Sequence, residues 1–453
     1  MQSVNPSTGQ VIKDYHETPI ETARDIAGRV GDAVERWRDE PVERRSAALE
    51  KVAQVLLEGR QAFADLMARE MGKPVTEGVA EVEKCAKVCR YYASHGPAFL
   101  QPERVETEAY KSYVAFEPLG VILAVMPWNF PFWQVFRFAA PALAAGNGVV
   151  LKHASNVTGC AIALEKVFAQ AGLPEDLFRA VFLDKEAVLP LIDAPQIAAV
   201  TLTGSPGAGR EIAARAGRAL KKSVLELGGS DPYLILADAD VENAARICVK
   251  SRLINTGQSC IAAKRFIVVP ERRDEFEKLV VQFMSAARQG DPLDPRTELG
   301  PLARADLRDQ LHEQVVRSVE KGARLLLGGS IPNRPGAWYP ASVLTDVAPD
   351  MPAYDEELFG PVAAILPAKD EEDAIRLAND TSFGLGAAVF TSDRERGERI
   401  ARDRLRAGSC FVNAYVRSDP RLPFGGIRDS GYGRELAGFG IREFTNVKTI
   451  YVD

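Results

Sequence analysis

Hydrophobic residues between Pro19 and Phe99 recur every three to four positions, with charged residues between them. The spacing is clearest in ETARDIAGRVGDAVERWRD and RRSAALEKVAQVLLEGRQAFADLMAREMG. Because an α-helix turns once in about 3.6 residues, this period places the apolar side chains on one helix face. We therefore expect this part of the chain to form amphipathic helices.

The pattern changes after these helices. The segment TEAYKSYVAFEPLG alternates apolar and polar residues, which predicts a strand of a small β-ribbon. From residue 121, short apolar runs alternate with helical stretches. The runs are VILAVM, VVLK, RAVFL, AAVTLTG and SVLEL, followed from Asp231 by YLILADAD, KRFIVVP, ARLLLGG, PVAAILP, GAAVFTSD and GSCFVN. This alternation predicts parallel sheets with helices on both faces, in two α/β domains.

The composition is that of a globular protein and narrows the expected partners. The chain has 453 residues, of which 46% are hydrophobic and 26% charged, and its formal net charge is −6. Because there is no basic excess to attract phosphates, we expect neither a nucleic-acid nor a membrane partner. The start MQSVNPSTGQ is unlike a signal peptide, and six cysteines in so long a chain do not indicate a disulfide scaffold. We expect a cytoplasmic location.

The histidine pattern argues against a metal site. The four histidines do not pair with each other or with a cysteine at the spacing of zinc ligands. Cys85 and Cys89 share one helix face, but two thiols without further nearby ligands make a poor metal site. Together with Cys160 and Cys248, they lie among apolar neighbours on predicted helices, and we expect them to be small core residues.

Two residues could carry chemistry. Cys260, in NTGQSCIAAKR, follows a turn and precedes a basic strand start; it is either a nucleophile, which needs nearby dipoles or cations to form thiolate, or a small buried residue. Glu226, in KSVLELGGSDP, ends an apolar strand before Gly228 and Gly229. It is either a general base at the crevice where ligands collect in open sheets, or a solvated carboxylate at a strand end.

Two loops are further candidates. TGSPGAG, residues 203–209, follows a strand and opens a helix, so that its backbone N–H groups could hold a pyrophosphate. It lacks the G-x-G-x-x-G fingerprint, and a packing turn is the alternative. In PWNFP, Asn129 has proline-restricted neighbours and offers a held amide donor for an oxyanion, although such a loop is also a common turn.

Together these segments resemble the aldehyde dehydrogenase superfamily. The resemblance runs nearly end to end and is carried, in order, by PWNFP, VVLKHAS, TLTGSPGAG, LELGGSDP, GQSCIAAKR, EELFGPV and PFGGIRDSGYGRE. The short chain and the segment KHASNVTGC are most similar to the short bacterial succinate-semialdehyde dehydrogenases. The resemblance implies that Cys260 forms a thiohemiacetal and then a thioester, that Asn129 with the Cys260 N–H stabilises the oxyanion, and that Glu226 activates the hydrolytic water.

The resemblance also implies a dinucleotide site. Trp128 and Lys152 match positions near the adenosine ribose. The remaining matches are Gly204 and Ser205 near the pyrophosphate, Leu227 beside the nicotinamide, Glu357 on the nicotinamide ribose, and Phe359 nearby.

The adenosine end of this site bears on the choice of cofactor. Ser155 stands where the family usually has a Glu that binds both ribose hydroxyls. The carboxylate of that Glu would repel a 2′-phosphate. Because Ser155 removes this repulsion, and Lys152 with the Ser155 hydroxyl could bind the phosphate, NADP is favoured over NAD. His153, where proline is common, is expected to alter the shape of this loop.

The substrate assignment depends mainly on Arg137, which the resemblance implies clamps a distal carboxylate, while its snorkelling to the surface is the alternative. Ser418 adds a hydroxyl, and Trp133 lies on the same helix as Arg137. The expected reaction is NAD(P)-dependent oxidation of succinate semialdehyde to succinate. One alternative is a broad-range enzyme for apolar or aromatic aldehydes, with Trp133, Phe132 and Phe136 lining the pocket; a catalytically silent dinucleotide-binding protein is another.

For the fold, the resemblance implies α/β architecture with a Rossmann-like cofactor domain, a catalytic α/β domain and an oligomerisation ribbon. We expect residues 1–102 and 120–228 in the cofactor domain and 229–428 in the catalytic domain. Residues 103–119 and 429–453 would form the ribbon and the C-terminal tail. Because an exposed sheet edge invites pairing, the ribbon predicts a homodimer or homotetramer.

Overall fold

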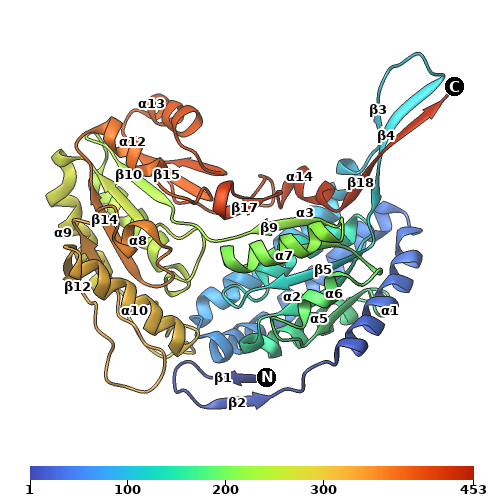
Figure 1. Cartoon of the computed structure of the whole chain (residues 1–453), viewed down its shortest axis with the longest axis horizontal. Coiled ribbons are helices and arrows are strands. Elements are labelled where there is room, and N and C mark those ends of the chain that lie inside the picture. Colours follow the sequence, from blue (N-terminus) through green and yellow to red (C-terminus); the bar gives the residue numbers. More distant parts are fainter.

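The computed structural model describes all 453 residues and contains two large sheets, each in its own lobe, with a ribbon projecting from one of them (Figure 1). The six-stranded sheet has the order β17-β9-β8-β5-β6-β7. Its strands are β5 (Val121–Met126), β6 (Gly148–His153), β7 (Phe178–Val181), β8 (Ile197–Thr203), β9 (Lys222–Glu226) and β17 (Gly431–Tyr432). All neighbours are parallel except β17, which runs antiparallel to β9. The five predicted strands of the first series are thus confirmed.

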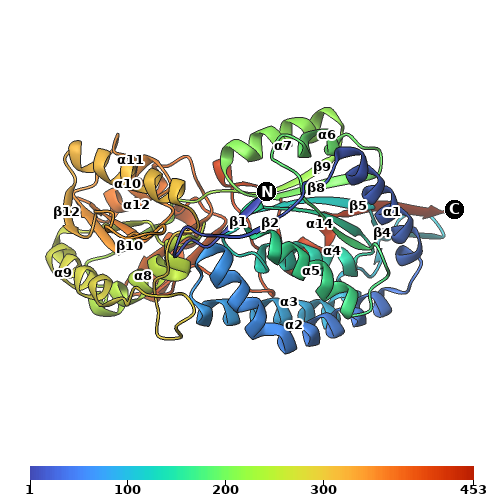
Figure 2. The same ribbon diagram turned by 90° about the horizontal axis from the view of Figure 1, so that it is seen from below.

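Helices cover both faces of this sheet (Figure 2). Those on one face are α1 (Ile20–Arg38), α6 (Val188–Ile192) and α7 (Pro206–Arg218). Those on the other are α4 (Trp133–Ala144) and α5 (Thr158–Gln170), with α2 (Val42–Met71) and α3 (Val75–Phe99) packed outside them. The long helices expected before residue 100 are α1 to α3. Helix α6 covers only the second half of the predicted stretch KEAVLPLID.

The seven-stranded sheet has the order β12-β13-β14-β11-β10-β15-β16. Its strands are β10 (Pro232–Ile235), β11 (Arg265–Val268), β12 (Arg324–Leu327), β13 (Ser342–Thr345), β14 (Val362–Pro367), β15 (Gly386–Phe390) and β16 (Ser409–Val412). Only β12 is antiparallel to its neighbour. The helices of this lobe are α8 (Val241–Leu253), α9 (Pro270–Ala286), α10 (Ala305–Glu320), α11 (Pro352–Asp355), α12 (Glu371–Asn379) and α13 (Arg394–Arg399).

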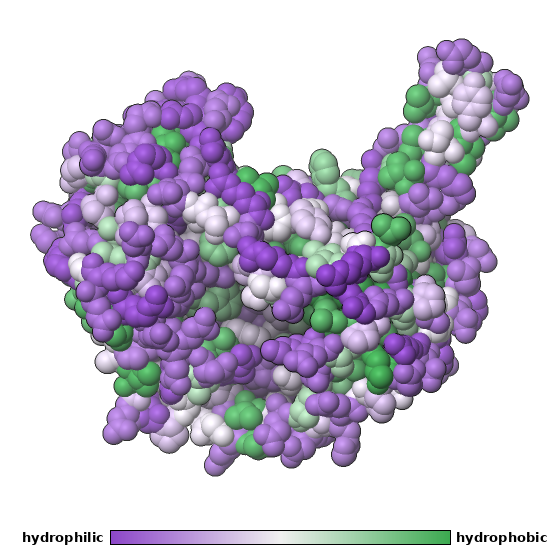
Figure 3. All heavy atoms as spheres, in the orientation of Figure 1, coloured by the Kyte–Doolittle hydropathy of each residue, from purple (hydrophilic) through white to green (hydrophobic).

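The ribbon is a three-stranded antiparallel sheet in the order β18-β4-β3. It joins β3 (Glu103–Arg104) and β4 (Lys111–Pro118) to the C-terminal β18 (Thr445–Val452), which follows α14 (Ala437–Glu443). It stands clear of the body and carries apolar residues (Figure 3). Val105, Tyr110, Val447, Tyr451 and Val452 are all exposed. A hairpin of β1 (Gln2–Val4) and β2 (Val11–Asp14), which the sequence pattern did not predict, completes the fold.

The strand order places a crevice where the two lobes meet. The chain passes from β5 to β6 and β7 on one side, then returns to β8 on the other side of β5. Such a reversal leaves a gap at the carboxyl ends of β5 and β8, where ligands bind in open sheets. The chain also leaves the carboxyl end of β9 at Glu226 and enters β10 at Pro232. The carboxyl edge of the first sheet therefore faces the second lobe. No helix is long and apolar enough to span a membrane.

Candidate active site

Cys260 lies between two cavities and lines both of them. One cavity, of about 480 Å³, also contains Trp128, Leu227 and Glu357, and the other, of about 590 Å³, contains Trp133. These volumes lie in the usual range for small-molecule sites. A thiol shared by two cavities can meet a ligand from each side, which is the geometry that a reaction between two bound molecules requires.

The loop before Cys260 has an unusual backbone. Asn255 and Thr256 have φ values of 54° and 55° inside the short helical segment Ile254–Gly257, and Gly257 follows at 75°. Three consecutive left-handed residues turn the chain sharply, and such strain is held only where surrounding contacts fix it. Here Glu77 of α3 accepts a hydrogen bond from the Asn255 N–H at 2.7 Å, and the Asn255 amide donates to the Asn129 carbonyl at 2.7 Å.

Lys264 holds the other side of this loop. Its ammonium donates to the carbonyls of Ser259, Cys260 and Ala262 at 3.0, 2.8 and 3.3 Å, and it lies 3.4 Å from the Glu357 carboxylate. The side chain is almost fully buried. No role was predicted for Lys264, because a lysine four residues after a cysteine carries no signal of which carbonyls it will meet.

The thiol of Cys260 is mostly protonated in this environment. Burial raises the pKa of Cys260 to about 12, while the nearby positive charges of Arg137 and Lys264 act in the opposite direction. The backbone N–H of Cys260 donates no hydrogen bond. The Asn129 amide, which donates to the Gln258 carbonyl at 3.1 Å, lies in the wall of the same cavity. The Asn129 amide and the Cys260 N–H thus both belong to residues that line this cavity.

Glu226 lies at the end of β9, as predicted, but its carboxylate is turned away from both cavities. The residue is 2% exposed, and neither carboxylate oxygen has a hydrogen-bond partner. A Cβ atom built on Gly425, which has a φ of +153°, would lie 2.7 Å from Glu226 Oε1, so the carboxylate packs against that glycine. Burial raises the pKa of Glu226 well above its ordinary value. The side chain must rotate to meet anything bound at Cys260.

The first cavity contains six of the eight predicted cofactor-binding residues, which are Trp128, Gly204, Ser205, Leu227, Glu357 and Phe359. The rings of Trp128 and Phe359 meet edge to face at 5.7 Å. Ser205 caps α7 by accepting from the Ala208 N–H at 3.3 Å, with Pro206 in the first turn. The N-terminus of this helix therefore opens into the cavity, where its N–H groups favour an anion.

The remaining two, Lys152 and Ser155, lie outside the lining of this cavity at the end of β6. Because β5 and β6 pair with Val125 opposite Lys152, the two residues stand beside the Trp128 loop. Ser155 is exposed, and burial lowers the pKa of Lys152. His153 accounts for the local loop shape: its ring nitrogens contact the Pro131 carbonyl at 2.9 Å and the Met126 carbonyl at 3.2 Å, joining this loop to the Asn129 loop.

The second cavity contains the three predicted substrate-binding residues, Arg137, Trp133 and Ser418. Arg137 does not snorkel to the surface, since it is 2% exposed. Its Nε forms an ion pair with Glu435, and its Nη2 donates to the Thr203 hydroxyl at 3.3 Å. Phe132 and Phe136, considered as lining for an apolar pocket, lie instead in the core and touch neither cavity.

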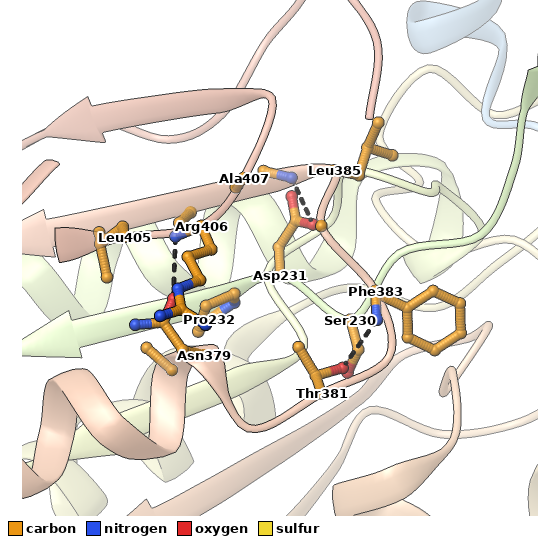
Figure 4. Close-up of a pocket in the computed structure, with 14 residues that line it drawn as sticks. Ser230, Asp231, Pro232, Asn379, Thr381, Phe383, Leu385, Leu405, Arg406 and Ala407 are labelled. Atoms are coloured by element: carbon orange, nitrogen blue, oxygen red, sulfur yellow. Dashed lines mark hydrogen bonds between the residues drawn. The ribbon is translucent and has the colours of Figure 1, made fainter. Parts of the chain in front are cut away.

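A small cavity of about 10 Å³ behind the β9–β10 connection is a packing feature (Figure 4). It holds room for about one water. Asp231 accepts there from the Gly386 N–H at 3.0 Å, and Asn379 accepts from the Arg406 N–H at 2.8 Å. The Asp231 carbonyl also accepts from the N–H groups of Lys264 and Arg265, at 3.2 Å each. This cluster supports the strand that follows Cys260 and is separate from the two larger cavities.

Comparison with known proteins identifies the arrangement. The model of the aldehyde dehydrogenase family matches residues 1–450. A succinate semialdehyde dehydrogenase (NAD(P)+) of Escherichia coli (strain K12) is 46% identical over 454 residues, which cover 100% of this chain and 97% of that protein. A probable succinate-semialdehyde dehydrogenase (NADP(+)) of Synechocystis sp. is 45% identical over 453 residues, 99% of each chain. The crystal structure of a succinic semialdehyde dehydrogenase from Streptococcus pyogenes in complex with NADP+ superposes with a TM-score of 0.97 at 38% identity, covering 100% and 99% of the two chains.

Proposed function

The chain belongs to the aldehyde dehydrogenase family, and from this premise we propose that it oxidises succinate semialdehyde to succinate, with NADP as the favoured cofactor and NAD as the alternative. The observation that carries the proposal is the position of Cys260 between a cavity suited to a dinucleotide and a second cavity lined by Arg137 and Ser418. The two relatives named above, which this chain matches over 97% and 99% of their length, are named as a succinate semialdehyde dehydrogenase and a probable one. Their names give NAD(P)+ and NADP(+) as the cofactor.

The first cavity fits a dinucleotide. The N-terminus of α7 would hold the pyrophosphate, with Gly204 and Ser205 beside it, and Glu357 would accept from the nicotinamide ribose near Leu227. Trp128 and Phe359 offer apolar surface to the rest of the molecule. Lys152 and the Ser155 hydroxyl would bind a 2′-phosphate, because no carboxylate stands at position 155 to repel it.

Cys260 would act as the nucleophile. The thiol first loses its proton to water, and the resulting thiolate attacks the aldehyde carbon. A C–S bond forms, the π electrons of the carbonyl move onto its oxygen, and this oxyanion accepts from the Asn129 amide and the free Cys260 N–H. The bound nicotinamide supplies the acceptor for the hydride that leaves this carbon. Loss of the hydride from the thiohemiacetal leaves a thioester on Cys260.

Glu226 would then release the product. Once its carboxylate has turned from Gly425 towards the sulfur, it leaves the dry site that raises its pKa and can take a proton from water. The resulting hydroxide attacks the thioester carbon, the C–S bond breaks, and succinate leaves with the thiolate restored. Movement of Glu226 is a requirement of this mechanism, because the carboxylate lines neither cavity as it stands.

The ribbon would join subunits. It projects from the body (Figure 3), and its edge is unpaired. Its residues Tyr110, Val447 and Tyr451 are exposed. Pairing with a second copy would cover the unpaired edge and these exposed side chains, giving a homodimer or homotetramer. All six cysteines are free thiols, which suits the reducing cytoplasm.

The proposed function is tested with purified protein, succinate semialdehyde, butanal and each dinucleotide. We expect NADPH formation with succinate semialdehyde, a lower kcat/KM with butanal, and weaker use of NAD. Absence of turnover with either dinucleotide would reject the proposal. Equal kcat/KM values for the two aldehydes would instead favour a broad-range enzyme, a reading that the burial of Phe132 and Phe136 away from the cavity already weakens.

A further inference from the structure

Lys84 lies in the wall of the aldehyde cavity without a carboxylate partner. It is on α3, and its ammonium donates to the Ser418 hydroxyl at 2.6 Å and stands 4.0 Å above the centre of the Trp133 ring. It takes part in none of the ion pairs of the structure. Since an ammonium has three donors, at least one remains for a ligand.

Most of the other deeply placed charges of this cavity are compensated by an ion pair. Glu77 is not, but its carboxylate accepts from the Asn255 N–H at 2.7 Å and burial raises its pKa to about 7. Arg137 is paired with Glu435, and Glu81 is paired with Lys73 while also accepting from the N–H groups that begin α4. Each of these pairs has no net charge. The free cations Lys87 and Arg417 are exposed at the rim. Lys84 is therefore the recessed positive charge that a bound anion would meet first.

We propose that Lys84, together with the Ser418 hydroxyl, binds the terminal carboxylate of the substrate and sets the preference for acid-bearing over uncharged aldehydes. The inference rests on the proposed function, since it assigns a receptor within the same cavity. Arg137 remains beside this receptor: its Nη1 makes no hydrogen bond and can donate to the same carboxylate. Because the charge of Arg137 is balanced by Glu435, Arg137 can offer the carboxylate a hydrogen bond, while the unpaired Lys84 supplies the positive charge that attracts it.

The physical reason is the cost of a half-buried, unpaired ammonium. Burial and the neighbouring charge of Arg137 lower the pKa of Lys84 to about 8. A carboxylate that enters the cavity restores the favourable interaction that the ammonium has lost with water, and it does so through a charge-assisted hydrogen bond. An uncharged aldehyde of equal length gains nothing from Lys84. The effect should therefore appear in the ratio of kcat/KM values for the two kinds of aldehyde.

The test compares succinate semialdehyde with butanal, which has the same chain length without the acid. Loss of one charge-assisted hydrogen bond predicts that Lys84→Met lowers the kcat/KM ratio of the two aldehydes about 10- to 100-fold, mainly through KM for succinate semialdehyde. Lys84→Arg, which keeps the charge, should retain most of the ratio. Lys51→Met is the matched control: it removes an exposed lysine of α2 that does not line this cavity, and it should leave the ratio unchanged.

The outcomes separate this inference from the proposed function. Suppose that the unmodified enzyme prefers succinate semialdehyde and that Lys84→Met lowers kcat/KM equally for both aldehydes. Lys84 then only holds the Ser418 loop against α3, and the inference is wrong. If the unmodified enzyme oxidises both aldehydes equally well, the proposed substrate is wrong. Inhibition by succinate gives a readout without turnover: its inhibition constant should rise in Lys84→Met, while that of the uncharged butyramide should not.

The pH dependence gives an independent readout. The ammonium binds the carboxylate only while protonated, so the kcat/KM ratio should be constant below about pH 7 and fall as pH rises through about 8. In Lys84→Arg the fall near pH 8 should be absent. Taking butanal as the reference cancels titrations that affect both substrates. The charged and titratable groups of this cavity are Glu77, Glu81, Lys87, Arg137, Cys260, Tyr415, Arg417, Asp419 and Arg421, and Cys85 is next to Lys84 in the chain. Burial raises the pKa of Glu77 to about 7, so any pH dependence that persists in Lys84→Arg belongs to Glu77 or another of these groups. A ratio that is flat in the unmodified enzyme up to pH 10 (about two units above the lysine pKa) would contradict the inference.

Discussion

The guanidinium of Arg137 forms an ion pair with the carboxylate of Glu435, and the two side chains are only 2% and 3% exposed. Arg137 lies on α4, the helix that follows the Asn129 loop. Glu435 lies just before α14, almost three hundred residues later in the chain. The pair joins the wall of the aldehyde cavity to the C-terminal segment that also carries Gly425 and the ribbon strand β18. It makes Arg137 a partly satisfied donor rather than a free charge.

Removing Glu435 should destabilise the protein strongly. In Glu435→Gln the guanidinium of Arg137 stays buried without its counter-charge, which predicts a loss of about 3–5 kcal/mol in the free energy of unfolding. Urea unfolding monitored by tryptophan fluorescence measures it. Glu242→Gln is the control, because Glu242 pairs with Arg246 at 2.7 Å on the exposed face of α8, where a pair contributes about 1 kcal/mol or less. Equal losses in the two variants would contradict the structural role of the Arg137–Glu435 pair.

Replacing Glu226 should separate the two halves of the reaction. Glu226→Gln keeps the shape of the side chain but removes the base, so the first turnover should still produce NADPH rapidly. Steady-state turnover should fall by about 10²- to 10⁴-fold, the usual contribution of a general base. Stopped-flow absorbance of NADPH measures the burst. Unchanged steady-state turnover would remove Glu226 from the mechanism.

The cofactor preference should depend on position 155. Ser155→Glu places a carboxylate beside the site proposed for the 2′-phosphate, so kcat/KM should fall at least about tenfold for NADP and rise for NAD. Ser285→Glu adds the same charge to an exposed position on α9 and is the control. Initial rates with both dinucleotides measure the change. If Ser155→Glu changes kcat/KM for NADP and for NAD by the same factor, the adenosine end of the dinucleotide lies elsewhere.

The reactivity of Cys260 in the free protein should rise with pH without levelling off near neutrality. Because burial raises the pKa of Cys260, the thiolate fraction is small at pH 7 and increases about tenfold per pH unit while the pH stays below that pKa. Alkylation by iodoacetamide, followed by mass spectrometry between about pH 7 and pH 10, measures this. Cys260→Ala gives the background from the other thiols. A plateau below about pH 9 would show that the free thiol is more exposed or better stabilised than the structure indicates.

Much of the fold could be predicted because its elements depend on local patterns. The alternation of apolar runs and helices predicted β5 to β9 and both parallel sheets, and the strand ends at Met126, Thr203 and Glu226 place the predicted site residues at one crevice. The β1–β2 hairpin was missed because β2 is exposed throughout and has no apolar alternation. The antiparallel strand β17 was missed because two residues are too short to carry a pattern.

The sequence motifs predicted which residues would lie near the site, but not the contacts that those residues make. Glu435, Lys264 and Lys84 were not identified, because each acquires its role from partners on other elements that spacing does not reveal. The turn of the Glu226 carboxylate towards Gly425 is likewise a property of packing. The predicted domain boundaries, the oligomer and the individual residue roles remain predictions.

The proposed reaction depends above all on acylation of Cys260 between the two cavities. The most direct measurement is mass spectrometry of the Glu226→Gln protein, digested at low pH after mixing with NADP and succinate semialdehyde. We expect one succinyl group, carried as a thioester by the peptide that contains Cys260 and removed by hydroxylamine. NADPH formation with this peptide unmodified, or with the acyl group on another residue, would contradict it.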